Sequence, residues 1–524
     1  MFISRVDGHR REWKTGSIMT GPSDHRAVVV QVRELDSSAR RKERIVRHRS
    51  HILFRGVLLI LGCALVAAPV YSDEVDDFVR ATMEEQKIPG ISIAVVREGK
   101  PARVQGYGLA NIELEVPVTP DTIFQSGSVG KQFTAAGILL LAEQGKLKLD
   151  DPLALHFPSA PASWHRITIR HLLTHTSGIK DSEDDAYEAR RDYTEEELLE
   201  ISFKFPLEFA PGSQWSYCNT GYMILGILTS KLTDMHWSEF QKQRIFEPAG
   251  MTTARVISES DIIKNRADGY ERNEEGELRN QEWVPPSDNT LADGSLYVTA
   301  RDMVAWDAAL RERRLLSEAS YDAWWTPVSL GDGITFPYGF GWSLNEQRGR
   351  RLIEHGGSWQ GFRAAIARYV EDKLTVVVLA NAAGTPTEAM AHEIAGIVDD
   401  DLRLPDPKAP GVDPDPQRTA RLEDLLKAWA ESRTTPEMGR GLAATASGSV
   451  SESFDRSRTG QLLEKKKSFS WLEDDDLGSR SMERRGETVT GIAHYALVTE
   501  DARRVYRFYL TADGKVADFD WERR

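Results

Sequence analysis

The order of strand-like and helical patterns along the chain restricts the fold more than any other feature. Residues 91–111, "ISIAVVREGKPARVQGYGLAN", alternate apolar and polar side chains around Glu98-Gly99, which predicts a β-hairpin. Residues 338–382 contain four more strand-like runs, and the helix-like "TEAMAHEIAGIVDDDL" follows them. A long, mainly helical middle, residues 150–310, separates the two groups of strands. This order predicts one sheet assembled from both ends, with helices on both faces and a helical insertion beside it.

A proline-rich segment divides the chain. Residues 403–417, "RLPDPKAPGVDPDPQ", predict an extended linker, so that residues 73–402 form one domain and residues 418–524 another. In the second domain, strand-like runs follow one helix and end in a hairpin that turns at Asp513-Gly514. The apolar face of that helix consists of Leu422, Leu425, Leu426 and Trp429. We predict a small α+β domain whose helix-then-sheet order is similar to the cystatin or NTF2-like fold.

The first 72 residues form a basic arm followed by an apolar run that contains one arginine. Small residues at Val70 and Ser72 suit signal peptidase cleavage before Asp73, and the apolar run is short for a membrane span. We therefore expect a periplasmic or secreted protein. Two alternatives stay open: an uncleaved leader that anchors the protein in the membrane, and a start codon downstream of Met1.

Charge and cysteine content exclude several classes of partner. Basic residues exceed acidic ones by 7 up to Arg55, so the rest of this chain of net charge −14 carries about −21. A surface this acidic argues against nucleic acid as a partner. It also argues against a membrane as a partner, unless the leader is retained as an anchor. With Cys63 in the leader, Cys218 has no disulfide partner and no thiolate metal cluster is possible. His171 and His175 have the spacing of a zinc pair but lack the accompanying glutamate, so we expect no metal and no cofactor.

A serine and a lysine stand three residues apart before an apolar helix. The stretch "FQSGSVGKQFTAAGILLLAEQG" lacks the first glycine and the hydroxyl of a phosphate-binding loop, and it is not a G-x-S-x-G elbow. If Ser128 opens the helix, Lys131 lies one turn along on the same face. A desolvated lysine can then take the proton of the serine hydroxyl. A second such pair begins at Ser177, but Gly178 breaks the helix that would hold it.

Two further segments carry candidate chemistry. "PGSQWSYCNTGY" places Tyr217 and Asn219 in a loop, where a tyrosine beside Lys131 can relay protons and an asparagine amide can orient the lysine and bind a substrate amide. "EHGGSWQGF" places His355-Gly356-Gly357 on a strand whose glycines permit close approach of a substrate. Taken singly, each segment fits a structural role better than a catalytic one, as a packed aromatic with a turn asparagine or as a bulge.

In this order the three segments resemble the serine β-lactamase and penicillin-binding-protein superfamily, specifically its class C-like branch. That branch includes β-lactamases, D-Ala-D-Ala carboxypeptidases, D-aminopeptidases and carboxylesterases. The phrases "IPGISIAVVREGK", "KLKLDDPL", "ITIRHLLTHTSGI" and "YGFGW" also carry the resemblance, which covers residues 75–402. It implies a β-lactamase-like α/β (α+β) fold, an antiparallel sheet flanked by helices with a helical subdomain beside it.

The resemblance also implies roles for individual residues. It implies three catalytic residues: Ser128 as the acylated nucleophile, Lys131 as its activator and Tyr217 as a proton relay. It implies five substrate-binding residues: Asn219, His355, Gly356, Gly357 and Ser358. The backbone N–H groups of Ser128 and Ser358 would form the oxyanion hole.

One departure from the family pattern concerns charge. His355-Gly356-Gly357 occupies the place of Lys-Thr-Gly, which removes a cation and a hydroxyl that would bind a β-lactam carboxylate. His355 is expected to be mostly neutral at pH 7. Arg363 either restores a charge or is a surface arginine of a strand.

These features predict an exported serine acyl hydrolase that forms an acyl-Ser128 intermediate. Its substrate would be a small molecule or peptide with a scissile acyl bond, as an ester, an amide or a D-amino-acid peptide. The alternative is a catalytically inactive binding protein of the same fold that uses its C-terminal domain as an interaction surface. Retention of Ser128, Lys131, Tyr217 and Asn219 together favours the enzyme.

Overall fold

A computed structural model of the chain describes residues 73–524, apart from residues 182–190, 259, 274, 282–290, 447–452, 479–480, 501 and 524. The basic arm and leader, residues 1–72, lie outside the described residues. Among the helices that the structure describes, none is both long and apolar enough to cross a membrane.

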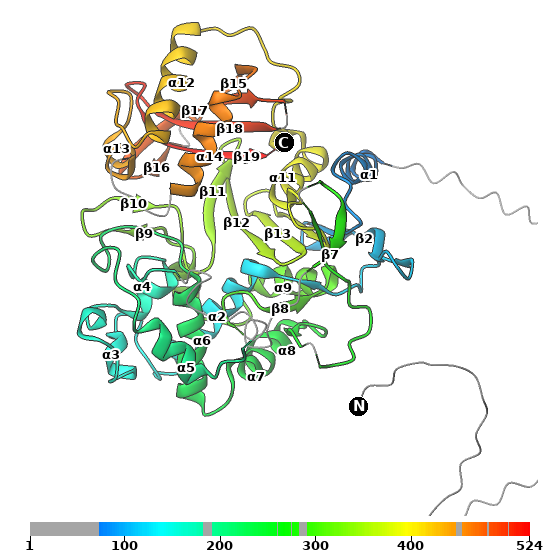
Figure 1. Ribbon diagram of the computed structural model, residues 1–524, viewed down its shortest axis with the longest axis vertical. Helices are drawn as coiled ribbons and strands as arrows, with labels where there is room; N and C mark the ends of the chain where they lie inside the picture. The colour runs from blue at the N-terminus through cyan, green and yellow to red at the C-terminus, as the bar shows by residue number, and fades with distance from the viewer. Residues whose placement is uncertain are drawn as a thin grey trace, which may run out of the picture. The chain divides into compact units, whose positions relative to one another are not determined.

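Seven antiparallel strands form the central sheet in the order β11-β12-β13-β14-β1-β2-β3 (Figure 1). They are β1 (Gly90–Arg97), β2 (Lys100–Asn111), β3 (Val116–Pro117), β11 (Ser343–Gln347), β12 (Arg350–Trp359), β13 (Phe362–Tyr369) and β14 (Leu374–Ala380). Pairing of β1 with β14, with Ile93 opposite Val378, joins the first hairpin to the later strands. The predicted sheet assembled from two distant parts of the chain is therefore confirmed.

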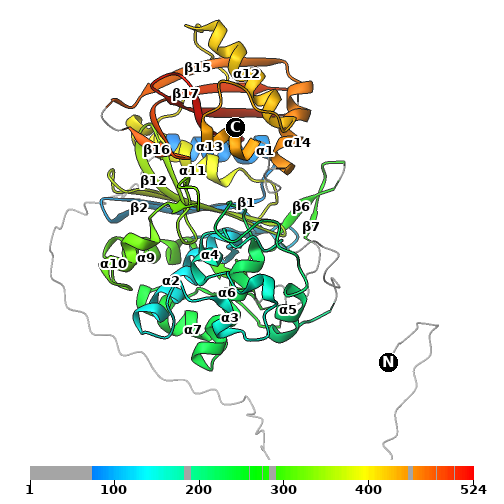
Figure 2. The same ribbon diagram turned by 90° about the vertical axis from the view of Figure 1, so that its left-hand side faces the viewer.

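Helices cover both faces of this sheet (Figure 2). On one face, α1 (Glu74–Gln86) and α11 (Thr387–Val398) pack on aliphatic side chains of β1, β13 and β14. On the other face, α2 (Lys131–Glu143), α6 (Asn219–Thr233) and α9 (Ala300–Arg311) enclose a larger core. Because both faces are buried, β1 reads as a nearly continuous apolar run.

The helical part of the fold contains short elements. Its other helices are α3 (Leu153–His156), α4 (Ile169–Leu173), α5 (Glu195–Ser202), α7 (Trp237–Gln241), α8 (Glu247–Ala249) and α10 (Glu318–Trp324). Small sheets join β4 (Phe124–Gln125) and β5 (Arg255–Val256) to β8 (Leu296–Val298), β6 (Tyr270–Arg272) to β7 (Leu278–Asn280), and β9 (Val328–Ser329) to β10 (Thr335–Phe336). Capping boxes begin three of the helices, with Thr168 at α4, Thr194 at α5 and Thr299 at α9.

The serine of the S-x-x-K motif precedes its helix rather than opening it. The sequence predicts a helix from Ser128, but this residue lies in the 3₁₀ turn η1 (Gly127–Gly130), and α2 starts at Lys131. Gly127 has φ +50°, and a Cβ there would lie 2.5 Å from the backbone nitrogen of Ser358. The close approach of β12 therefore holds this turn in a conformation that favours glycine.

The C-terminal part is a second antiparallel sheet covered by helices. It begins with a helix at Pro416, two residues before the predicted domain start at residue 418. Its strands are β15 (Ser468–Asp476), β16 (Met482–Arg484), β17 (Glu487–Val498), β18 (Arg503–Thr511) and β19 (Val516–Arg523), and its helices are α12 (Pro416–Ala430), α13 (Arg440–Ala446) and α14 (Ser453–Glu464). The predicted apolar face of α12 is buried, and β18 and β19 form the predicted hairpin. Asp415 caps α12 at Pro416, so the last two residues of the predicted linker are helical. The domain boundary itself stays a prediction.

Candidate active site

Ser128 and Lys131 are in direct contact. The Nζ atom of buried Lys131 lies 3.1 Å from Oγ of the half-buried Ser128. It also lies 2.7 Å from Oδ1 of Asn219 and 2.8 Å from the carbonyl oxygen of Asp293. The lysine is therefore held at the serine hydroxyl by two oxygen acceptors that lie 88 and 162 residues away in sequence.

Asn219 is itself oriented by a carboxylate. Its Nδ2 donates to Asp181 at 3.0 Å, and the other oxygen of Asp181 accepts from the backbone nitrogen of Thr220 at 2.9 Å. Asp181 thus satisfies the N-terminus of α6 and turns Oδ1 of Asn219 toward Lys131. Sequence reasoning missed Asp181 and Asp293, because neither stands in a local pattern with the residue that it contacts.

Tyr217 completes the group around the serine. Nζ of Lys131 lies 4.8 Å from the centre of the tyrosine ring. The hydroxyl oxygen is buried close to Ser128 and Lys131, but it makes no well-aligned hydrogen bond with any described residue. Burial raises the pKa of Tyr217, and the charge of Lys131 opposes that rise. A neutral phenol with an uncommitted hydroxyl next to a serine hydroxyl is suited to proton transfer.

The free edge of β12 passes beside Ser128. Pairing of β12 with β11 ends at Glu354, which leaves residues 355–359 open on that side. A Cβ on Gly357 would lie 2.0 Å from the carbonyl oxygen of Ser126, so glycine is required for this approach. As a result, the backbone of Ser358 runs alongside the turn that carries Ser128, where an oxyanion hole would be needed.

His355 faces the buried side of the site. Its Nε2 lies 2.9 Å from the hydroxyl of Tyr338, and its Nδ1 lies 2.6 Å from the carbonyl oxygen of Gly356. The same hydroxyl lies 3.2 Å from Nε2 of His175. Burial lowers the pKa of His355 to about 4, so its imidazole is neutral near pH 7. Sequence reasoning gave Tyr338 no role, although it begins the phrase "YGFGW".

These residues open onto a cavity of about 560 Å³. The N-terminal part (residues 73–402) lines it with residues that include Ser128, Tyr217, His355, Gly356 and Ser358. The C-terminal part lines it with residues that include Arg484, Arg485, Asp520 and Trp521. Strands β16 and β19 therefore supply one wall of the cavity that Ser128 lines.

A buried histidine joins the two parts behind this cavity. Nε2 of His392, on α11, lies 2.6 Å from Oε2 of Glu354, and its Nδ1 lies 2.8 Å from Oε2 of Glu522, on β19. Burial lowers the pKa of His392, but the interactions with the carboxylates of Glu354 and Glu522 raise it by more, and the pKa is about 9. A protonated imidazole thus bridges two buried carboxylates, one from each part.

The histidines of "HLLTH" do not form a ligand pair. Nδ1 of His171 accepts from the backbone nitrogen of Thr168 in the capping box of α4. Helix α4 ends at Leu173, and Nδ1 of His175 accepts from the backbone nitrogen of Cys218. Each ring is committed to a different structural hydrogen bond.

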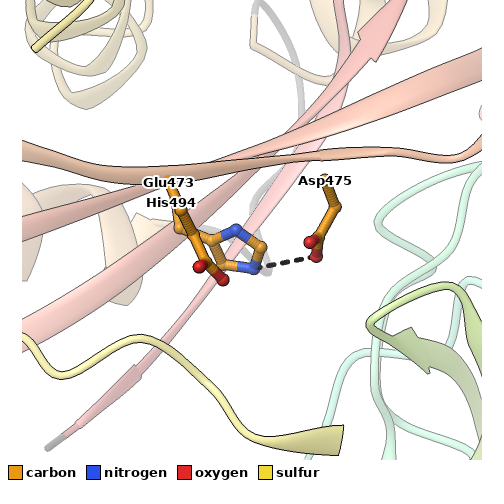
Figure 3. A group of neighbouring side chains, drawn as sticks. All are labelled: Glu473, Asp475 and His494. Carbon is orange, nitrogen blue, oxygen red and sulfur yellow. Dashed lines mark ion pairs between the residues drawn. The ribbon is translucent and has the colours of Figure 1, made fainter. Parts of the chain in front are cut away.

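One other cluster has the composition of a metal site. Ligand atoms of Glu473, Asp475 and His494 lie within 4.8 Å of one another (Figure 3). The guanidinium of Arg348 already pairs with both carboxylates. Burial, together with the positive charges of Arg507 and Arg348, lowers the pKa of His494 to about 3. Arginines thus supply the positive charge here, and we assign no metal to this cluster.

Comparisons with known proteins agree with this arrangement. The family described as Beta-lactamase matches residues 75–398. Penicillin-binding protein 4* of Bacillus subtilis (strain 168) is 30% identical over 292 residues, which cover 52% of this chain and 64% of that protein. A D-aminopeptidase of Gluconobacter oxydans (strain 621H) is 28% identical over 364 residues, which cover 66% of this chain and 64% of that protein. The chain thus spans slightly less than two thirds of these relatives.

Solved structures show the same fold. A penicillin-binding protein from Bacillus halodurans is 27% identical with a TM-score of 0.53, over 60% of this chain and 99% of that one. The octameric penicillin-binding protein homologue from Pyrococcus abyssi is 24% identical with a TM-score of 0.57, over 86% of this chain and 98% of that one. With the family match over residues 75–398 and a serine–lysine pair at its centre, this chain belongs to the β-lactamase family of serine hydrolases.

Proposed function

We propose that this protein hydrolyses esters, amides or D-amino-acid peptides through an acyl-Ser128 intermediate. The main support for the proposal is the contact between Nζ of Lys131 and Oγ of Ser128, which lie 3.1 Å apart. Ser128 also lines a cavity that is large enough for a small substrate. Relatives named D-aminopeptidase, at 28% and 30% identity, support a substrate with an amide bond to a D-amino acid.

The contacts of Lys131 suit the role of general base. Its Nζ donates to Oδ1 of Asn219 and to the carbonyl oxygen of Asp293, and it contacts Oγ of Ser128. An unprotonated amine held in this way has its lone pair available for the serine hydroxyl. It takes the hydroxyl proton while Oγ attacks the substrate carbonyl. The N–H groups of Ser128 and Ser358 then stabilise the oxyanion, and loss of one such donor costs about 3–4 kcal/mol.

Tyr217 is placed for the second proton transfer. It relays the proton to the leaving alcohol or amine as the scissile bond breaks and the acyl-Ser128 ester forms. In deacylation, a water molecule gives its proton to the same groups and adds to the ester carbonyl. Oγ of Ser128 recovers a proton as the acid product leaves.

Labelling with a fluorophosphonate probe tests this function. We expect covalent labelling of the wild-type chain and none of Ser128→Ala. Turnover is then measured on p-nitrophenyl esters, D-amino-acid p-nitroanilides and a chromogenic cephalosporin. Absence of both labelling and turnover would contradict the proposal and favour a binding protein that uses its C-terminal part.

We propose export for this hydrolase on the basis of its leader sequence. The small residues Val70 and Ser72 support cleavage before Asp73. N-terminal sequencing of the protein recovered from periplasm and medium tests this location. A chain found in the membrane with its leader intact would support the anchored alternative.

A further inference from the structure

A chain of hydrogen bonds links two buried histidines through one tyrosine hydroxyl. The hydroxyl oxygen of Tyr338 lies 3.2 Å from Nε2 of His175 and 2.9 Å from Nε2 of His355. Tyr338 precedes β11, His175 is in the turn after α4, and His355 is on β12. All three side chains are buried, so each polar atom in this chain depends on the others for a hydrogen-bond partner.

The contact at one end of the chain fixes the proton of His175. The backbone N–H of Cys218 donates to Nδ1 of His175 at 3.1 Å. Burial lowers the pKa of His175 well below its usual value, so the ring is neutral near pH 7. A neutral imidazole that accepts at Nδ1 carries its proton on Nε2. His175 therefore donates to the oxygen of Tyr338.

The contact at the other end fixes the proton of His355. Its Nδ1 lies 2.6 Å from the carbonyl oxygen of Gly356, and a carbonyl oxygen can only accept, so Nδ1 carries a proton. Because the ring is neutral near pH 7, its Nε2 is an acceptor for the hydroxyl proton of Tyr338. The two histidines thus have opposite tautomers.

Both ring nitrogens of His355 are therefore used within the protein. His355 lines the cavity, but its Nε2 accepts from Tyr338 and its Nδ1–H donates to Gly356. Neither nitrogen is left for a substrate group. This differs from the substrate-binding role that the family resemblance implies for His355.

The carbonyl group that His355 holds is on the free edge of β12. In an antiparallel strand the N–H and C=O groups of one residue point to the same side, as do those of the residue two positions along. The backbone nitrogen and oxygen of Ser358 lie beside Gly127, where a Cβ would be 2.5 and 2.6 Å from them. The carbonyl of Gly356 therefore points to this same edge.

We propose that His355 is a positioning residue, which Tyr338 holds in the Nδ1–H tautomer so that the ring fixes the Gly356 carbonyl and the edge of β12. The N–H group of Ser358, two residues along, is then held at a constant place beside Ser128, where the oxyanion would form. The inference rests on the proposed acyl-serine mechanism for its effect on rate. The tautomers themselves are a property of the folded chain alone.

Nitrogen-15 NMR of the full chain, labelled selectively in histidine, tests the tautomers directly. A ring nitrogen that carries a proton resonates far from one that does not, and the signals lost in His355→Asn and His175→Gln assign the two residues. At pH 7 we expect Nδ1–H for His355 and Nε2–H for His175. Tyr338→Phe removes the donor to His355 and should give this ring a mixture of tautomers. His175 should keep Nε2–H, because the N–H of Cys218 still donates to its Nδ1.

Tyr369→Phe is the matched control. Tyr369 is also buried, but its hydroxyl donates to Oε1 of Gln347 at 2.7 Å. The substitution therefore removes a buried hydroxyl that is not in the histidine chain. It should leave both tautomers as they are in the wild type.

Two substitutions of His355 separate positioning from substrate binding. His355→Asn keeps an N–H donor at the δ position and loses the ε nitrogen, whereas His355→Gln places its amide at the ε position. On a p-nitrophenyl ester, the asparagine variant should keep kcat within about twofold of the wild type. The glutamine variant should lose about two- to tenfold, the effect of one neutral hydrogen bond.

The outcomes separate this inference from the proposed function. A His355 with its proton on Nε2, or on both nitrogens, in the wild type at pH 7 would overturn the inference. A glutamine variant more active than the asparagine variant would also overturn it, since Nε2 would then be the atom that matters. If Tyr338→Phe does not fold, the wild-type spectra and the two variants of His355 still decide the question. Absence of Ser128-dependent turnover would overturn the proposed function, and the wild-type spectra would still test the tautomers.

Discussion

At the scale of single residues, the site depends on how two side chains are held beside Ser128. Lys131 is fixed by Asn219 and the Asp293 carbonyl, so its amine cannot swing away from the hydroxyl. Tyr217 has its hydroxyl buried beside them without a well-aligned hydrogen bond to a described residue. In the proposed mechanism both residues move protons in the transition state rather than bind the ground state.

We predict that Lys131→Ala and Tyr217→Phe each lower kcat by at least about a hundredfold, because each removes a proton-transfer group. KM should change much less. Steady-state kinetics on a p-nitrophenyl ester measure both parameters, and circular dichroism checks the fold. Near-normal turnover in both variants would remove the mechanism.

A second prediction concerns the charge of His355. With a pKa of about 4 it supplies no positive charge between pH 6 and 8. The wild type should therefore hydrolyse p-nitrophenyl esters measurably and cephalosporins poorly. His355→Lys should shift the ratio of kcat/KM values toward the cephalosporin by about ten- to a hundredfold, the worth of a charge-assisted hydrogen bond to its carboxylate. Efficient cephalosporin hydrolysis by the wild type at pH 8 would refute the argument from charge, and Arg363 would be tested next.

At the scale of elements, α11 serves the site and the junction between the two parts of the chain. Its first turn places Glu388 at β12, and the next turn places His392 between Glu354 and Glu522. An element that packs on the sheet therefore also fixes the position of β19 beside the cavity.

The raised pKa of His392 predicts a pH-dependent stability. Because its folded-state pKa of about 9 exceeds the ordinary value of about 6.5, the stabilisation is fully present below pH 6.5. It is lost as the pH rises from about 6.5 to 9. His392→Gln should be less stable than the wild type by on the order of 1–3 kcal/mol at pH 6.5, and the difference should shrink toward pH 9. Thermal melts of both proteins across this range measure it; parallel curves would contradict the role assigned to His392.

At the scale of the whole molecule, each of the two parts has its own hydrophobic clusters, and the two parts share one cavity. The two large apolar clusters of the N-terminal part contain no residue beyond Leu402, and the clusters of the C-terminal part contain none before Leu422. Polar contacts join the two parts, as between His392 and Glu522 and between Arg348 and Glu473, and the guanidinium of Arg485 lies over the ring of Phe336. The C-terminal part thus shapes the cavity without sharing an apolar cluster with the N-terminal part.

We predict that a chain ending at Pro410 stays soluble and hydrolyses small p-nitrophenyl esters, because both apolar clusters of the N-terminal part remain whole. It should melt at a lower temperature, since Glu522 no longer pairs with His392. Its KM for a peptide long enough to reach Arg485 and Trp521 should rise, because one wall of the cavity is gone. Solubility, melting temperature and kcat/KM on both substrates test this, and an insoluble fragment would show that the two parts depend on each other to fold.

Local patterns in the sequence are sufficient to predict the fold and the three segments of the site. Alternation of period two predicts the hairpin and the later strands, and an apolar run after S-x-x-K predicts α2, because these signals are local. The motifs also identify Ser128, Lys131, Tyr217 and Asn219, which the structure brings together.

The contacts that hold and surround these residues follow from the packing of the folded chain, not from local patterns. Asp181 orients Asn219 from 38 residues away, and Glu388 fits against Gly356 only because α11 packs on the sheet beside β12. No local pattern marks such contacts, since they follow from packing between segments that are distant in sequence. The same reason applies to the cavity wall: that Trp521 and Arg485 lie in the space that contains Ser128 depends on how two separately cored parts of the chain meet.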